Sequence, residues 1–321
     1  MAFLVRQWFL VALGITMLVG YFAGEQLEFL ARSPALKWTI VSLTLFLMSW
    51  PVELSSFQQT LKKPKAAALG CLINMLVLPL MGWAIVPWLG PMFGPGLAVA
   101  VAAPATLASA AVWTRRAGGD DSVAILITIV TNGLCFLTMP FWIYWLTGTS
   151  VESSLLWSTV QNLFLFVVIP IGVAQWVRFL NKRLAAWATN QKKRLSVLAQ
   201  VGILFMILLG AIGTRLKLVN EDTAFDGLQF GFMVAAVIVL HLTAFALGLW
   251  LAAKLGISTR QRIAVGIGGS QKTLMIGLTA AVSLGLSMIP IVVFQVFQLT
   301  VDAMIADWYR ARHHEELGTK G

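Results

Sequence analysis

Long uncharged stretches alternate with short polar ones along the chain, and this pattern predicts a bundle of membrane-spanning helices. A helix needs about 20 apolar residues to cross the hydrocarbon core of a bilayer. The stretches are 7–24, 38–52, 66–114, 122–151, 153–177, 195–214, 227–253 and 263–301, the last interrupted only by Lys272. The second stretch is short, so its helix must extend into the flanking residues.

Two of these stretches are too long for one helix. The stretch 66–114 contains a segment rich in Pro and Gly at 87–96, which predicts a tight turn between two helices. The stretch 263–301 divides in the same way near 285–290. The pattern therefore predicts ten spans.

The distribution of basic residues supports this count and gives an orientation. If the N-terminus is cytoplasmic, 18 of the 23 Lys and Arg fall in the cytoplasmic loops and ends. They are Arg6, Lys62, Lys63, Lys65, Arg115, Arg116, Arg178, Lys182, Arg183, Lys192, Lys193, Arg194, Lys254, Arg260, Arg262, Arg310, Arg312 and Lys320. Cytoplasmic loops of membrane proteins carry such an excess, so both termini are predicted to be cytoplasmic.

Composition places nearly the whole protein in the bilayer. The chain has 321 residues, 59% hydrophobic and 11% charged, with a mean hydropathy of +0.84, whereas soluble domains carry about 25% charged residues. The net charge of +10 is attributed to the cytoplasmic loops rather than to nucleic-acid binding. Both cysteines lie in apolar stretches, and no motif typical of an enzyme is present, so we predict a membrane protein that is not an enzyme.

The spans divide into two sets of five. The fifth span ends at about 151, and the longest polar segment, 178–194, follows the sixth span near the middle of the chain. Because five is odd, two homologous halves would insert with opposite topology, as in many secondary transporters. We therefore predict one all-α membrane domain over 1–321, with repeats at about 1–151 and 153–310.

Two spans contain features that a continuous apolar helix would not. Pro104 interrupts a run of small residues at 102–111, and the segment 266–274 combines three glycines with four consecutive polar side chains. Paired interruptions in the two halves indicate a binding site made by broken helices. Close packing of small residues explains 102–111 equally well, but it does not explain the polar side chains of the second segment. The candidate binding residues in these spans are Thr106, Ser109, Ser270, Gln271, Lys272 and Thr273.

Other polar residues lie within the predicted spans. Asn74, Thr128, Asn132 and Gln298 are further candidates for binding an ion or substrate, although each could instead hydrogen-bond a neighbouring helix. For His241 we favour a neutral ring bonded to a backbone group. For Asp302 we favour an ion pair with Arg310, two turns along the same helix, over a proton-binding site.

Lys272 is predicted to lie near the middle of the membrane. It follows Arg262 by ten residues, or about 15 Å of helix. A charge at this depth is costly, so its ammonium either tethers the carbonyls of the broken fourth span or takes the place of a bound sodium ion and releases its proton during transport.

Several motifs together resemble the bile acid:sodium symporter family. They are Lys63-Pro64-Lys65-Ala66 with Asn74 and Pro79, the segments 104–109 and 113–119, and Gly268-Gly-Ser-Gln-Lys-Thr-Leu274, which resembles the SBF-like branch. The resemblance implies two inverted five-helix repeats. Spans 1, 2, 6 and 7 would form a panel, and spans 3–5 and 8–10 a core in which broken helices 4 and 9 cross. It also implies a sodium site at Asn74, Thr128 and Gln271.

This chain departs from the sodium-coupled pattern, because Ile267 and Lys272 stand where those members have Glu and Asn. We therefore expect a secondary transporter that moves a small organic anion by alternating access, coupled to sodium or to protons. No cofactor is expected beyond a sodium ion, and the membrane is expected to be a bacterial inner membrane. The alternative is a membrane regulator or scaffold that retains the fold without transporting.

Overall fold

The computed structural model describes residues 8–53, 64–107, 109–148, 153–220 and 226–318, and the regular secondary structure in these residues is helical. The first half contains α2 (Trp8–Phe22), α3 (Glu28–Ala31), α4 (Pro34–Ser49), α6 (Lys65–Leu72), η1 (Ile73–Val77), α7 (Leu78–Ile85), η2 (Val86–Trp88), α8 (Gly94–Ala102), α9 (Ser109–Arg116) and α10 (Asp121–Thr147). The second half contains α11 (Ser153–Leu163), η4 (Phe164–Val168), α12 (Ile169–Leu180), α13 (Lys182–Asn190), α14 (Lys192–Asn220), α15 (Gly227–Lys254), α16 (Thr259–Ser270), α17 (Leu274–Ser283) and α18 (Ile289–Gly318). Of the predicted cytoplasmic residues, Arg6, Lys62, Lys63 and Lys320 lie outside the described residues.

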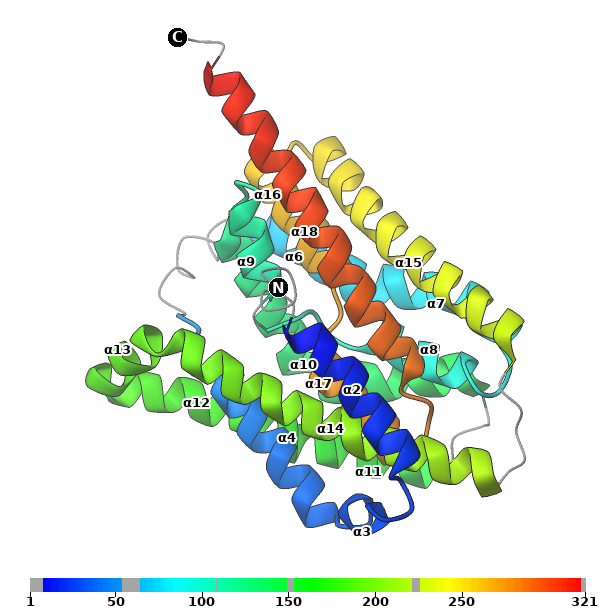
Figure 1. Ribbon diagram of the computed structural model, residues 1–321. Helices are drawn as coiled ribbons and strands as arrows, with labels where there is room; N and C mark the ends of the chain where they lie inside the picture. The colour runs from blue at the N-terminus through cyan, green and yellow to red at the C-terminus, as the bar shows by residue number, and fades with distance from the viewer. Residues whose placement is uncertain (1–7, 54–63, 108, 149–152, 221–225, 319–321) are drawn as a thin grey trace.

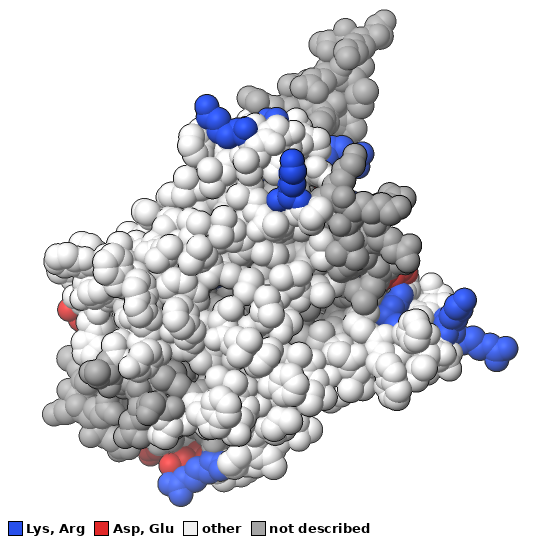
Figure 2. Space-filling model, turned by 180° about the vertical axis from the view of Figure 1, so that it is seen from behind, with Lys and Arg blue, Asp and Glu red and all other residues white. Residues whose placement is uncertain are grey.

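The described part of the chain has six helices that are long and apolar enough to cross a membrane. They are 65–88, 121–147, 157–180, 192–216, 227–254 and 289–311, and two shorter apolar helices cover 11–22 and 34–49. The surface agrees with this: one face is broadly uncharged, with the charged side chains at its edges (Figure 2). The chain is therefore an integral membrane protein.

The helices pack in two groups. In the first, α14 packs along α2 and α4, and α4 also contacts α12. In the second, α15 packs against α16 and α18, while α16 also contacts α6, α9 and α10. Figure 1 shows α4, α12, α13 and α14 gathered on one side of the molecule, with α15, α16 and α18 on the other.

Two apolar helices are interrupted where the sequence predicted it. The helix α8 ends at Ala102, and Ala103 is extended, with φ −60° and ψ 147°. Proline causes this break, because Pro104 lacks an N–H and its ring disfavours a helical residue before it. The second interruption lies between α16 and α17, where Gln271 and Thr273 are extended. We call residues 103–107 and 271–273 together the crossing.

Glycines allow the helices around the crossing to approach closely. A Cβ at Gly248 of α15 would lie 3.1 Å from the Cα of Gly266 in α16, and one at Gly269 would lie 3.1 Å from the side chain of Ile73. The glycines of 266–274 thus serve packing, which leaves its polar side chains to be explained separately.

Candidate functional site

The two helix breaks lie against each other at the crossing. The backbone N–H of Thr273 donates to the carbonyl oxygen of Pro104 at 2.8 Å, and the ammonium of Lys272 donates to the carbonyl oxygen of Ala103 at 2.8 Å. Broken helices leave backbone groups without intrahelical partners, and these groups must be satisfied inside a membrane. Side chains from neighbouring helices supply the other partners.

Polar residues of α10 bind the first break. Thr128 donates to the carbonyl of Thr106 at 3.0 Å, Thr131 accepts from the backbone N–H of Ala105 at 3.2 Å, and Asn132 donates to the carbonyl of Ala105 at 2.8 Å. All three side chains of α10 are buried. The amide oxygen of Asn132 has no hydrogen-bond partner among the described residues, so an acceptor remains free beside the crossing.

Asn74 and Gln298 bind the second break. The side-chain amide of Asn74, in the π-helical turn η1, donates to the carbonyls of Gly269 at 3.2 Å and Gln271 at 2.8 Å. Gln298 of α18 accepts from the backbone N–H of Lys272 at 2.8 Å and donates to its carbonyl at 2.7 Å. These side chains replace hydrogen bonds that a continuous helix would have made within itself.

Lys272 is fully buried, and its ammonium lies among oxygen atoms. Its Nζ is 2.7 Å from the backbone oxygen of Asn74, 3.4 Å from the side-chain oxygen of the same residue and 2.8 Å from the carbonyl of Ala103. An ammonium has three hydrogens to donate and no lone pair, so three acceptors suit the charged form. The contact with Ala103 is the tether to the broken fourth span that the sequence offered as one explanation.

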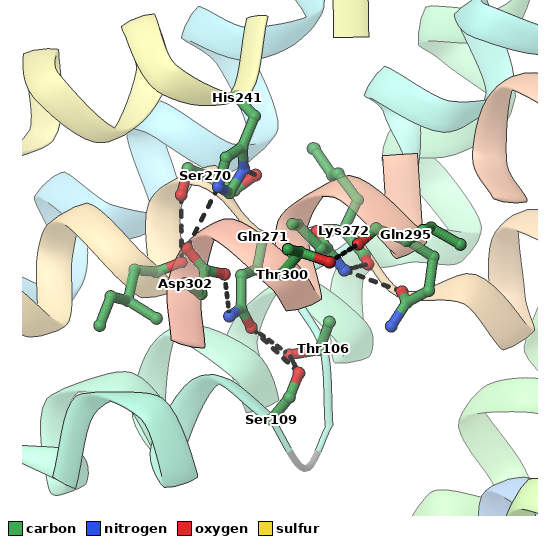
Figure 3. Close-up of polar contacts among 12 residues, drawn as sticks. Thr106, Ser109, His241, Ser270, Gln271, Lys272, Gln295, Thr300 and Asp302 are labelled. Carbon is green, nitrogen blue, oxygen red and sulfur yellow. Dashed lines mark hydrogen bonds and ion pairs between the residues drawn. The ribbon is translucent and has the colours of Figure 1, made fainter. Parts of the chain in front are cut away.

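The side chain of Gln271 joins both halves of the chain. Its amide oxygen accepts from Thr106 at 2.6 Å and from Ser109 at 3.2 Å, and its amide nitrogen donates to Asp302 of α18 at 2.5 Å (Figure 3). Ser109 is half-buried, whereas Gln271 and Asp302 are fully buried. A continuous chain of polar side chains therefore runs from the first turn of α9 to α18.

The interpretation of Asp302 as the partner of Arg310 was wrong. Asp302 is fully buried, and its Oδ1 lies 3.1 Å from Nε2 of His241 in α15. Eight residues of helix correspond to about 12 Å, which is too far for an ion pair along one face. The other nitrogen of His241, Nδ1, is 3.3 Å from the backbone oxygen of Ser270, so the predicted bond to a backbone group is present as well.

The structure brings most of the predicted binding residues together at the crossing. Direct hydrogen bonds connect Asn74, Thr106, Ser109, Thr128, Asn132, Gln271, Lys272, Thr273 and Gln298 either to one another or to the backbone of the breaks. The side-chain nitrogen of Asn74 and the hydroxyl of Thr128 donate to carbonyls, and the side-chain oxygen of Asn74 lies 3.4 Å from Nζ of Lys272. The side chain of Gln271 faces other polar side chains. Sodium binding at these three residues stays a prediction.

The comparison with protein families gives a match over nearly the whole chain. A model described as the SBF-like CPA transporter family matches residues 7–311. This chain belongs to that family. The resemblance based on sequence motifs is therefore confirmed.

Individual relatives of this SBF-like transporter are distant. This chain is 27% identical to an uncharacterized protein of Pseudomonas aeruginosa over 75% of this chain and 74% of that protein. It is 26% identical to a probable chloroplastic sodium/metabolite cotransporter, BASS4, of Oryza sativa, over 71% of this chain and 57% of the plant protein. A putative symporter of Escherichia coli, YfeH, is 22% identical over 76% of this chain.

Proposed function

We propose that this protein is a secondary transporter that moves a small organic anion by alternating access around the crossing. The observation that carries the proposal is the pair of helix breaks joined by Thr273 and Lys272, because broken helices in contact are how many transporters build a binding site. The names of the rice and Escherichia coli relatives, a sodium/metabolite cotransporter and a symporter, support it.

An anion suits the charges and dipoles at the crossing. The helices α9 and α17 both begin there, and a helix N-terminus carries a partial positive charge. Lys272 adds a buried ammonium between the breaks. The substrate class is therefore a small anion with a carboxylate or a similar group.

Alternating access would move one group of helices against the other. The two shorter apolar helices and the two broken helices, added to the six long ones, would make ten spans. The packing of α14 with α2 and α4 supports a panel, and the packing of α15, α16 and α18 supports a core. The coupling ion is sodium or a proton. For sodium, the free amide oxygen of Asn132 supports a ligand position.

Uptake into proteoliposomes tests the proposal. The purified full chain is reconstituted, and uptake of a panel of radiolabelled mono- and dicarboxylates is measured under a sodium gradient, a pH gradient or no gradient. Saturable uptake that depends on a gradient and is lost in Gln271→Leu is expected. Uptake no faster than in protein-free liposomes for every anion and gradient would favour the rival function, a regulator or scaffold without transport.

A further inference from the structure

The short helix α13 lies at the surface of the membrane. It has nine residues, and it joins two helices that are long and apolar enough to cross a membrane, 157–180 and 192–216. A nine-residue helix is about 14 Å long, whereas the hydrocarbon core is about 30 Å thick, so α13 cannot be a span. The connection between the two long helices stays at the level where they end, and α13 therefore borders the lipid headgroups.

Five exposed basic side chains lie in this connection. Two are in the first turn of α13 and three in the first turn of α14, and together we call them the basic cluster: Lys182, Arg183, Lys192, Lys193 and Arg194. Basic side chains project from the edge of the molecule where α12, α13 and α14 meet (Figure 2). The sequence has no Asp or Glu between Glu152 and Glu221, and within the described residues no side chain of the cluster forms an ion pair or a hydrogen bond. The positive charge of the cluster is therefore not balanced by the protein.

The stability of the helices does not explain the cluster. A helix N-terminus carries a partial positive charge, so acidic residues are favourable in a first turn and basic residues are unfavourable. The backbone of α13 already has its cap, because Oδ1 of Asn181 accepts from the N–H groups of Arg183 at 3.0 Å and Leu184 at 3.1 Å. A partner from outside the helices is therefore expected for these charges.

Arg178 shows how a basic side chain with a structural role is placed in the same region. Its side chain is only 13% exposed, and it lies 3.6 Å from Glu53. It donates to the carbonyls of Trp50 at 3.0 Å and Ala185 at 3.2 Å, and to the hydroxyl of Thr189 at 3.1 Å. These contacts fix α13 against the ends of α4 and α12, so the cluster is carried by a helix that is held in place.

The apolar side chains of α13 also suit the membrane interface. Ala188 is buried, and the rings of Trp187 and Trp50 pack with their centroids 5.2 Å apart. Leu184 and Trp187 are three residues apart, which places them on one face of the helix, and both are exposed. Helices that lie in the interface combine basic residues with exposed Leu and Trp in this way.

We propose that the basic cluster binds the headgroup phosphates of anionic phospholipids in the leaflet that α13 borders. Groups of about four to eight Lys and Arg beside the end of a membrane span attract anionic lipids. The length of α13 separates the two parts of the cluster by about 14 Å, so each part would bind a separate headgroup. Because α13 packs with α12 and α14, the bound lipids would anchor this group of helices in the membrane.

Acetylation of the lysines measures this binding without any transport. The purified full chain is placed in nanodiscs of phosphatidylcholine alone, or of equal parts phosphatidylcholine and phosphatidylglycerol, and the acetylation of each lysine is followed by peptide mass spectrometry. The reagent attacks a neutral amine, and a phosphate partner favours the charged ammonium. We expect phosphatidylglycerol to slow the acetylation of Lys182, Lys192 and Lys193 about fivefold relative to Lys254, an exposed lysine at the end of α15.

Two variants remove equal charge and keep all of these lysines as reporters. Arg183→Gln with Arg194→Gln takes two arginines out of the cluster, and the protection of the lysines should fall to about twofold or less. Arg260→Gln with Arg310→Gln removes two exposed arginines elsewhere on the protein, and the protection should stay as in the wild type. All four arginine side chains are exposed, so both variants should fold.

Three results would overturn the proposal. Equal acetylation of the cluster in the two kinds of nanodisc would mean that its charges do not bind lipid. Equal loss of protection in the two variants would mean that the membrane attracts the whole basic protein rather than this cluster. Protection by inorganic phosphate or polyglutamate in phosphatidylcholine nanodiscs, as strong as that by phosphatidylglycerol, would assign the cluster to a soluble partner. The measurement involves no uptake, so its failure leaves the proposed transport function untouched.

Discussion

The ammonium of Lys272 holds the two helix breaks together, and its removal should destabilise the protein. Lys272→Met keeps a side chain of similar length but deletes every donor to the backbone oxygens of Asn74 and Ala103. Each buried acceptor left without a partner costs about 1–3 kcal/mol, so the two together cost about 2–6 kcal/mol. The third contact, to the side chain of Asn74, is long at 3.4 Å and adds little.

The cost of burying the charge offsets only part of this loss. Taking an ammonium out of water costs several kcal/mol, and Lys272→Met removes that cost. A denatured helical membrane protein, however, keeps its spans in the micelle or bilayer, so the charge remains poorly hydrated in both states. The lost hydrogen bonds occur only in the folded protein. We therefore expect a net loss of folding free energy.

Equilibrium unfolding in mixed micelles with dodecyl sulfate, followed by tryptophan fluorescence, measures this loss. The matched control is Lys37→Met. Lys37 is partly buried and donates one hydrogen bond, at 3.3 Å to Ser283, so its replacement should cost no more than about 1.5 kcal/mol. If Lys272→Met and Lys37→Met lower the free energy of unfolding by the same amount, the tether contributes nothing and the reasoning is wrong.

Three further predictions test other levels of the structure. A reporter fused after Arg194 should read cytoplasmic and one inserted within 217–226 external, since the basic residues are so unevenly distributed; the reverse at either point would exclude the ten-span topology. Gly248→Ala should lower the free energy of unfolding by about 1–3 kcal/mol through overpacking, whereas the added methyl group of Gly231→Ala on the same helix meets open space and should not overpack. Equal melting temperatures of the two variants would contradict the close contact. Gln271→Leu should abolish uptake with nearly normal expression, and retained uptake would move the binding site elsewhere.

The helix breaks were predictable because their causes are local. Pro104 has no backbone N–H with which to continue the hydrogen bonds of a helix. Four consecutive polar side chains within an apolar stretch identify the second break. The turn at 285–290 was predictable for the same reason, and Gly285 takes a positive φ of 62° there. The helix α13 was missed, because its charges at 182–183 make 178–194 resemble a loop.

The pairing of Asp302 could not be read from the sequence, because its partners are remote. His241 is 61 residues away and Gln271 is 31 residues away, and only the packing of α15, α16 and α18 brings them together. The sequence suggested Arg310 on the same helix as the partner of Asp302, but eight residues of helix separate the two by about 12 Å along the axis. One signal was present: His241 and Asp302 are titratable residues within otherwise apolar stretches, and each had to find a buried partner.

The polar side chains at the crossing have two kinds of partner. Asn74, Gln298 and Lys272 bind backbone groups that the breaks set free, so they hold the two breaks in place. His241 and Asp302 contact each other at 3.1 Å. Loss of a residue of the first set should therefore lower the stability of the folded protein, because buried backbone groups would be left without partners.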